Sequence, residues 1–314
     1  MHGQRQKQEK TIRTYFMHTI YETDKGSYTS ICRNKIFLQM AEASAKEAHM
    51  SILYNIFHKK EIAEKQQAYK MYVDKFRYIG IELIYDDVEI IYLEKIYKQL
   101  LILLDDNTEI PNGFLAKLYI CSQEYYEKME GIVRNRKLLG STRWFISNNK
   151  LLVSVFISTN CFTEVALKKR ESELPIKKGF APEATLVHEF AHVMEYYLQY
   201  CKYNWKENPD IDAAMDVMSV EEIDTEVDCF ISKEIEIMDL CRKIILEIGV
   251  PRESKTRPIA TVGPILGGVA NTNYQEMFAE ALSQYYCSDK PLPISIRIYE
   301  EFSKLKQEYM KESE

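Results

Sequence analysis

One stretch of the chain, Ala181–Glu195, has the sequence A-P-E-A-T-L-V-H-E-F-A-H-V-M-E. Pro182 suits a first helical position, where its missing N–H has no partner to lose, and Glu183 complements the positive end of the helix dipole. Apolar residues then recur with the period of one buried helical face, at Leu186, Val187, Phe190, Ala191, Met194 and Leu198. The pattern predicts an amphipathic helix that ends near residue 200.

This predicted helix carries a His-Glu-x-x-His motif. On a helix, His188 and His192 stand one turn apart on one face, with Cβ atoms roughly 5–6 Å apart, so both imidazoles can bind one Zn²⁺ ion. Glu189 is rotated away from that line and can sit beside a zinc-bound water as a general base. The spacing can also arise by chance. The apolar neighbours Val187 and Phe190 favour the metal site, because buried imidazoles need polar partners.

Composition places few limits on function. The 314 residues suffice for one large domain plus a smaller one, or for a single two-lobed enzyme. With 46% hydrophobic and 28% charged residues, the composition is ordinary for a globular protein. A net charge of −6 argues against a nucleic-acid partner for the chain as a whole. The seven cysteines are widely spaced and form no C-x-x-C pair, so we expect reduced thiols and a cytoplasmic location.

The sequence shows no targeting segment. The first ten residues are polar and basic with no apolar core behind them, so we expect no signal peptide. No run approaches the roughly 18 apolar residues of a membrane span. If the protein acts outside the cell that makes it, its export uses a route that the sequence does not show.

The predicted fold class is α+β. Residues 1–78 form a mainly helical N-terminal region, since residues 34–77 contain no Pro or Gly. Residues 79–314 form a second domain, with a small mixed sheet packed against the His-Glu-x-x-His helix and a later glutamate-bearing helix. The expected elements are a strand at 78–85, a helix at 88–104, a strand at 116–121, a helix at 124–133, two strands at 142–147 and 151–157, a charged loop at 167–178, a helical insertion at about 203–270, and helices at 272–287 and 296–311.

A catalytic zinc site needs a third protein ligand. No further histidine follows the motif at a familiar spacing, and position 211, at one well-known offset, is Ile211. Asp212 lies in a loop after a helix breaker, which makes it a poor candidate. The helix at 272–287 offers Glu276 and Glu280 one turn apart among apolar residues, where carboxylates should be paired or metal-bound.

A resemblance bears on this choice. The segments H-E-F-A-H at 188–192 and N-Y-Q-E-M-F-A-E-A at 273–281 resemble the zinc site of the gluzincin metallopeptidases. They are most similar to the family of the anthrax toxin lethal factor catalytic domain and its relatives encoded by bacteria, phages and mobile elements. The resemblance covers residues 80–290 in the order of elements, but only these two helices in their motifs. It implies a zincin-like catalytic lobe with Zn²⁺ as cofactor.

The resemblance assigns roles to the second helix. Glu276 would be the third zinc ligand and Glu280 a supporting residue that holds a ligand histidine; the competing assignment makes Glu280 the ligand. The family also has a tyrosine, seven residues before the ligand glutamate, that donates to the oxyanion. That position is Val269 here. Either Tyr274, Tyr196 or a tyrosine from another loop takes this role, or the transition state is less well stabilised.

The predicted function is that of a zinc-dependent endopeptidase acting on a protein or peptide substrate, with Glu189 activating the water. The strand at 151–157 is the expected sheet edge that pairs with an extended substrate, and residues 1–78 would serve recognition. One alternative is a non-catalytic zincin-fold protein with a structural or interaction role, such as a phage or mobile-element assembly factor. Val269 favours that alternative and Glu189 disfavours it. Another is an acidic helical adaptor without metal. The substrate and the oligomeric state are not indicated.

Overall fold

The computed structural model describes residues 59–131, 138–147, 150–202, 236–248 and 262–312. The chain divides into two compact units, residues 1–66 and residues 67–314. The expected domain boundary at residue 78 coincides with the end of helix α3, but most of the preceding region lies outside the described residues, and so does Asp212. The division into domains therefore stays a prediction.

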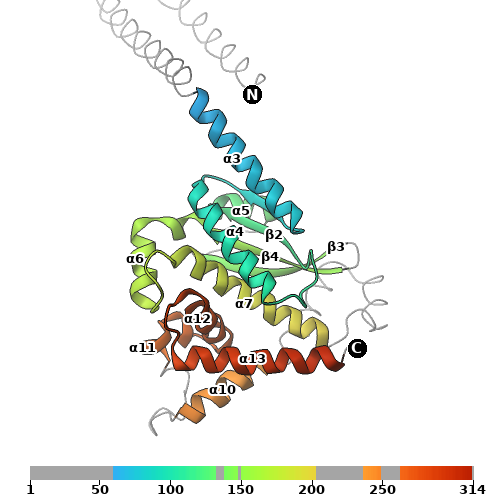
Figure 1. The fold of residues 1–314 in the computed structure, drawn as a ribbon, viewed down its shortest axis with the longest axis vertical. Helices are drawn as coiled ribbons and strands as arrows, with labels where there is room; N and C mark the ends of the chain where they lie inside the picture. Colours follow the sequence, from blue (N-terminus) through green and yellow to red (C-terminus); the bar gives the residue numbers. More distant parts are fainter. Residues whose placement is uncertain (1–58, 132–137, 148–149, 203–235, 249–261, 313–314) are drawn as a thin grey trace, which may run out of the picture. The chain divides into compact units, whose positions relative to one another are not determined.

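The second unit is a mixed α+β structure with a small sheet and many helices (Figure 1). The elements in chain order are α3 Lys59–Tyr78, β1 Glu82–Tyr85, α4 Ile90–Asp105, β2 Leu115–Cys121, α5 Gln123–Glu130, β3 Gly140–Ser147, β4 Lys150–Ser158, η1 Thr159–Phe162, α6 Glu164–Glu173, α7 Ala181–Lys202, α10 Glu236–Ile248, α11 Gly263–Leu266, η4 Val269–Asn271, α12 Tyr274–Cys287 and α13 Pro293–Glu312.

The four strands lie in the order β1-β2-β4-β3. β1, β2 and β4 run parallel, and β3 pairs antiparallel with β4, so the expected pairing of these last two strands is confirmed. The expectation that the strand at 151–157 forms the sheet edge is wrong. β4 has a partner on each side, and β3 is the edge strand next to it.

Both faces of strand β4 are buried. Along β4, Val153, Val155 and Ile157 belong to the main hydrophobic core, whereas Phe156 points to a smaller cluster on the opposite face. Such burial on both faces is typical of an interior strand. The smaller cluster is formed with Tyr119 of β2 and Tyr126 of α5, and the rings of Tyr126 and Phe156 stack with centroids 4.3 Å apart.

Helix α7 lies at the centre of the unit, between the sheet and the C-terminal helices. It contacts β3 and β4 on one side and α12 on the other, and α4 packs beside it (Figure 1). Its apolar face is almost fully buried, with Leu186, Val187, Phe190 and Ala191 at 0% exposure, as the sequence pattern predicts. Helices α10 and α13 in turn pack against α12. The His-Glu-x-x-His segment is therefore held between two packed layers.

The charged segment predicted as a loop at 167–178 is mostly helical, so that prediction is wrong for residues 167–173. Helix α6 begins after Thr163, whose hydroxyl accepts a hydrogen bond from the N–H of Ala166 at 3.3 Å. Its charges pair one turn apart, Lys168 with Glu164 and Lys169 with Glu173. Pairing along the helix explains how a segment with little apolar surface can still be helical.

Candidate metal centre

Two helices bring the predicted site residues together. His188 and His192 stand one turn apart on α7, with ring centroids 5.3 Å apart. Glu276 comes from the first turn of α12, which begins where the Asn273 side chain accepts a hydrogen bond from the N–H of Glu276 at 2.8 Å. That position places a carboxylate at the positive end of a helix dipole. α7 and α12 pack against one another, so residues 84 positions apart or more meet at one point.

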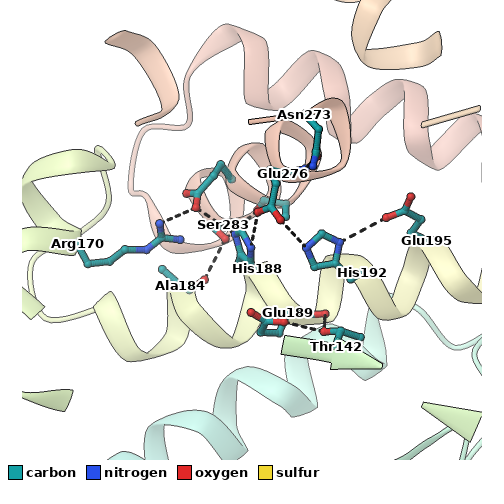
Figure 2. A network of polar contacts seen from close by, with 12 residues as sticks. Thr142, Arg170, Ala184, His188, Glu189, His192, Glu195, Asn273, Glu276 and Ser283 are labelled. Carbon is teal, nitrogen blue, oxygen red and sulfur yellow. Dashed lines mark hydrogen bonds and ion pairs between the residues drawn. The ribbon is translucent and has the colours of Figure 1, made fainter. Parts of the chain in front are cut away.

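The side chains of His188, His192 and Glu276 form a group that can hold a metal ion, with one ligand atom from each and all three within 4.8 Å of one another. Nε2 of His188 lies 3.1 Å from Oε2 of Glu276, and Nε2 of His192 lies 4.0 Å from Oε1 of the same carboxylate. Figure 2 shows both rings directed at Glu276. All three side chains are partly buried, with exposed fractions of 13%, 16% and 27%.

The other nitrogen of each imidazole faces its own carboxylate. Nδ1 of His188 lies 3.1 Å from Oε1 of Glu280, and Nδ1 of His192 lies 3.4 Å from Oε2 of Glu195. Both carboxylates are almost fully buried. Carboxylates in this position fix the orientation of a ligand histidine and raise its basicity. The arrangement fits a divalent ion, because it leaves Nε2 of both rings available on the side of Glu276.

A cation compensates the buried charge of Glu280. Arg170 of α6 contacts Oε1 of Glu280 through Nη1 at 2.7 Å, and the Glu280 side chain is 1% exposed. Burial by itself raises the pKa of this carboxyl, but Arg170 and His188 outweigh it and hold the pKa at about 2. Glu280 is therefore an anion that lies against Nδ1 of His188. The supporting role that the resemblance implies for it stays a prediction.

The carboxylates next to His188 change the pKa of its imidazole. Burial lowers the pKa of the imidazole, but the adjoining Glu276 and Glu280 outweigh that effect and raise it to about 10. The pKa of Glu276 is in turn lowered, because the effect of burial, which raises it, is exceeded by the contact with His188. Without a metal, the positive charge of protonated His188 offsets the negative charges of these two carboxylates.

Glu189 points away from the other side chains of the centre and toward the sheet. The Thr142 hydroxyl lies 2.8 Å from Oε2 of Glu189 and 2.9 Å from its main-chain oxygen (Figure 2). Glu189 is 5% exposed, yet it lines the same cavity as the two histidines and Glu276. That cavity has a volume of about 430 Å³ and lies between β3, α6, α7 and α12. Glu189 and the three candidate ligands therefore line one cavity.

The candidate oxyanion donors differ in whether they line the cavity. Tyr196 lines it and Tyr274 does not. Val269, which occupies the position of the family's tyrosine, also lines it. Burial raises the pKa of the Tyr274 hydroxyl, and the nearby Arg242 of α10 partly opposes this effect. Of the two tyrosines named from the sequence, Tyr196 is the one that the structure brings to the cavity.

Four neighbours of the site were not found from the sequence. Glu195 has a visible signal, since it follows His192 by three residues on the same helix face. Arg170 lies in the segment expected to be a loop, and Gly140 and Thr142 meet Glu189 only because β3 packs on α7. These three contacts depend on tertiary packing, for which the sequence carries no local pattern.

Comparisons with protein-family models, with curated proteins and with solved structures gave no match to this chain. None of the described helices is long and apolar enough to cross a membrane. The feature that bears on function is therefore the centre in which two histidines and a glutamate converge inside a mixed α+β unit.

Proposed function

We propose that the chain is a zinc-dependent endopeptidase with a zincin-like catalytic lobe, which hydrolyses peptide bonds of a protein substrate. One observation carries the proposal. Each imidazole of the His-Glu-x-x-His helix directs Nε2 toward Glu276 and Nδ1 toward a separate buried carboxylate. Two histidines and one glutamate make a three-ligand set of the kind that catalytic zinc uses, with a fourth position left for water.

The residues around the centre have distinct tasks in this proposal. A Zn²⁺ ion held by His188, His192 and Glu276 would polarise the scissile carbonyl and lower the pKa of the attacking water toward about 7. Glu189 accepts the proton of that water and passes it to the leaving amine. Glu280 and Glu195 keep the two rings oriented, and Arg170 compensates the charge of Glu280.

The edge strand β3 supports an extended peptide as the substrate. The N–H of Ser158 donates to the carbonyl of Leu139 at 2.9 Å, which fixes the hydrogen-bonded pairs between β3 and β4. Because such pairs alternate along an antiparallel ladder, Gly140 and Thr142 turn their backbone groups to the other side. No described strand pairs with that side, and the cavity adjoins its first residues. A substrate strand added there would pass the centre.

The test compares metal content and cleavage in four forms of the chain purified without chelator. Wild type and Glu189→Gln should each hold about one zinc per chain, and His192→Ala should hold none. Wild type should cleave members of a peptide library, with Glu189→Gln slower by about 10²–10⁴-fold. Glu183→Gln is the matched control, since Glu183 is buried on the same helix but pairs with Lys95 at 3.2 Å. It should keep both properties.

The outcomes separate the candidate functions. Zinc binding without any cleavage by wild type would favour the non-catalytic zincin-fold protein. That alternative has one structural observation on its side, because the family's tyrosine position is occupied by Val269, which lines the cavity. A wild type that holds no zinc would overturn the proposal altogether.

A further inference from the structure

The side chain of Glu189 is enclosed by two residues of the edge strand. The Thr142 hydroxyl bonds to Oε2 of the carboxylate and also lies 2.9 Å from the main-chain oxygen of the same residue. On the other side of the carboxylate, Oε1 lies against Gly140. A Cβ atom built on Gly140 would come within 2.1 Å of Oε1 and 2.7 Å of Cδ. No methyl group fits at Gly140 while Glu189 keeps its position.

The conformation of Gly140 does not explain the glycine. Gly140 is not among the residues with positive φ, so any residue type could adopt its backbone geometry. The contact that a larger residue would make is with the end of one flexible side chain and not with backbone. An alanine there therefore costs little stability, but it requires the Glu189 carboxylate to move.

We propose that Gly140 and Thr142 are positioning residues for Glu189, which hold its carboxylate in the cavity. This inference rests on the proposed function, in which Glu189 is the general base. Thr142 fixes the carboxylate through a hydrogen bond, and Gly140 provides the space that it occupies. Both belong to the strand whose open edge faces the substrate in that proposal, so one strand adjoins the peptide and holds the base.

Thr142→Val and Thr142→Ser test the hydrogen bond. Valine keeps the β-branched shape and removes the hydroxyl, whereas serine keeps the hydroxyl. Because a misplacement of about 1 Å can cost roughly 100-fold in rate, Thr142→Val should lower kcat by about 10–100-fold. KM and the zinc content should stay at the wild-type values, since the hydroxyl contacts neither a metal ligand nor the open edge. Thr142→Ser should recover most of kcat.

Gly140→Ala tests the space, with Gly268→Ala as the matched control. A Cβ on Gly268 meets nothing within 4 Å, and its φ of −66° suits alanine. Gly140→Ala should lower kcat by about 100-fold with little change in melting temperature. Gly268→Ala should leave both unchanged.

Crystal structures of the metal-free variants provide a readout that does not depend on activity. The Glu189 carboxylate should leave its wild-type position in Gly140→Ala and lose its fixed orientation in Thr142→Val. If it keeps its position in both variants, or if both retain full kcat in an active enzyme, the inference is overturned while the proposed function stands. If wild type proves inactive, the proposed function fails, and the structures still decide whether these residues position Glu189.

Discussion

Arg170 is not a candidate ligand, but it contacts Glu280, which lies against the candidate ligand His188. The Glu280 side chain is 1% exposed. A carboxylate buried to this degree is strongly destabilising without a partner. Arg170 therefore both stabilises the fold and fixes the anion that orients a candidate ligand.

We predict that Arg170→Met, which keeps an apolar stem of similar length, lowers the free energy of unfolding by about 3 kcal/mol, because a buried anion loses its partner. Zinc affinity should fall by roughly 10–100-fold, since Glu280 no longer holds His188 in place. Urea unfolding and competition with a chelator measure the two effects. Lys168→Met is the control, because Lys168 pairs on the same helix with side chains 74% and 81% exposed. Equal effects in both variants would contradict the role given to Arg170.

His188 gives the metal-free protein a predictable pH dependence. Its pKa of about 10 in the folded state exceeds the ordinary value of 6.5, so its contribution to stability is complete below pH 6.5 and is lost as the pH rises toward 10. Glu280 has the opposite sign, with a pKa of about 2 instead of 4.5, so its contribution is lost as the pH falls from 4.5 toward 2.

We therefore expect the metal-free protein to be most stable between about pH 4.5 and 6.5 as far as these two groups decide it, and to lose stability between pH 7 and 10. Zinc binding should remove the alkaline loss, because the metal takes the place of the proton on His188. Urea unfolding at pH 5.5 and 8.5, with zinc and with chelator, measures this. An alkaline loss of the same size in metal-free His188→Gln would assign the effect to other groups.

At the scale of elements, the sequence predicts α7 and α12 well because their signals are local. The apolar period of α7 lies within that helix, and the Asn273 cap directly precedes the first residue of α12. The position of β4 is a non-local property, decided by which strand pairs with β2. A signal for it nevertheless exists. β4 contains a nearly continuous apolar run, typical of an interior strand, whereas β3 carries Ser141, Thr142 and Arg143, as edge strands do.

The same limit applies to the site. His188, Glu189 and His192 follow from one helical repeat. Glu276 needed a resemblance as well, because its distance from the motif helix depends on how α7 packs on α12. Thr142 and Gly140 could not be predicted, because no local sequence pattern indicates that they contact Glu189.

The geometry of β3 predicts how an extended substrate responds to changes in its own backbone. Hydrogen bonds to one strand edge use every second residue of the added peptide. N-methylation of a cleaved peptide, one position at a time, should therefore raise KM with a period of two. The positions that do not face β3 serve as internal controls, because the same methyl group there removes no hydrogen bond. An even response along the peptide would exclude pairing with this edge.

At the scale of the whole unit, the candidate ligands join two layers that already pack without them. α7 belongs with the sheet and α4, and α12 belongs with α10 and α13. At the interface between α7 and α12, the hydroxyl of Ser283 donates to the carbonyl of Ala184 at 2.9 Å, and both residues are fully buried. We therefore expect the metal-free unit to stay folded, with zinc as an added link between its halves.

The predicted result is a melting temperature that depends on free zinc. An ion that binds only the folded state stabilises it by about 4 kcal/mol at 1,000 times its Kd. For a unit of this size that corresponds to an increase of roughly 10 °C. Thermal unfolding of the full chain with a chelator and with buffered zinc measures the shift. His192→Ala should melt at one temperature in both conditions, because the remaining two ligands bind the ion too weakly to link α7 to α12. A wild type that also melts at one temperature would show that no metal joins the two layers, and one that unfolds completely without zinc would show that the buried interface is insufficient by itself.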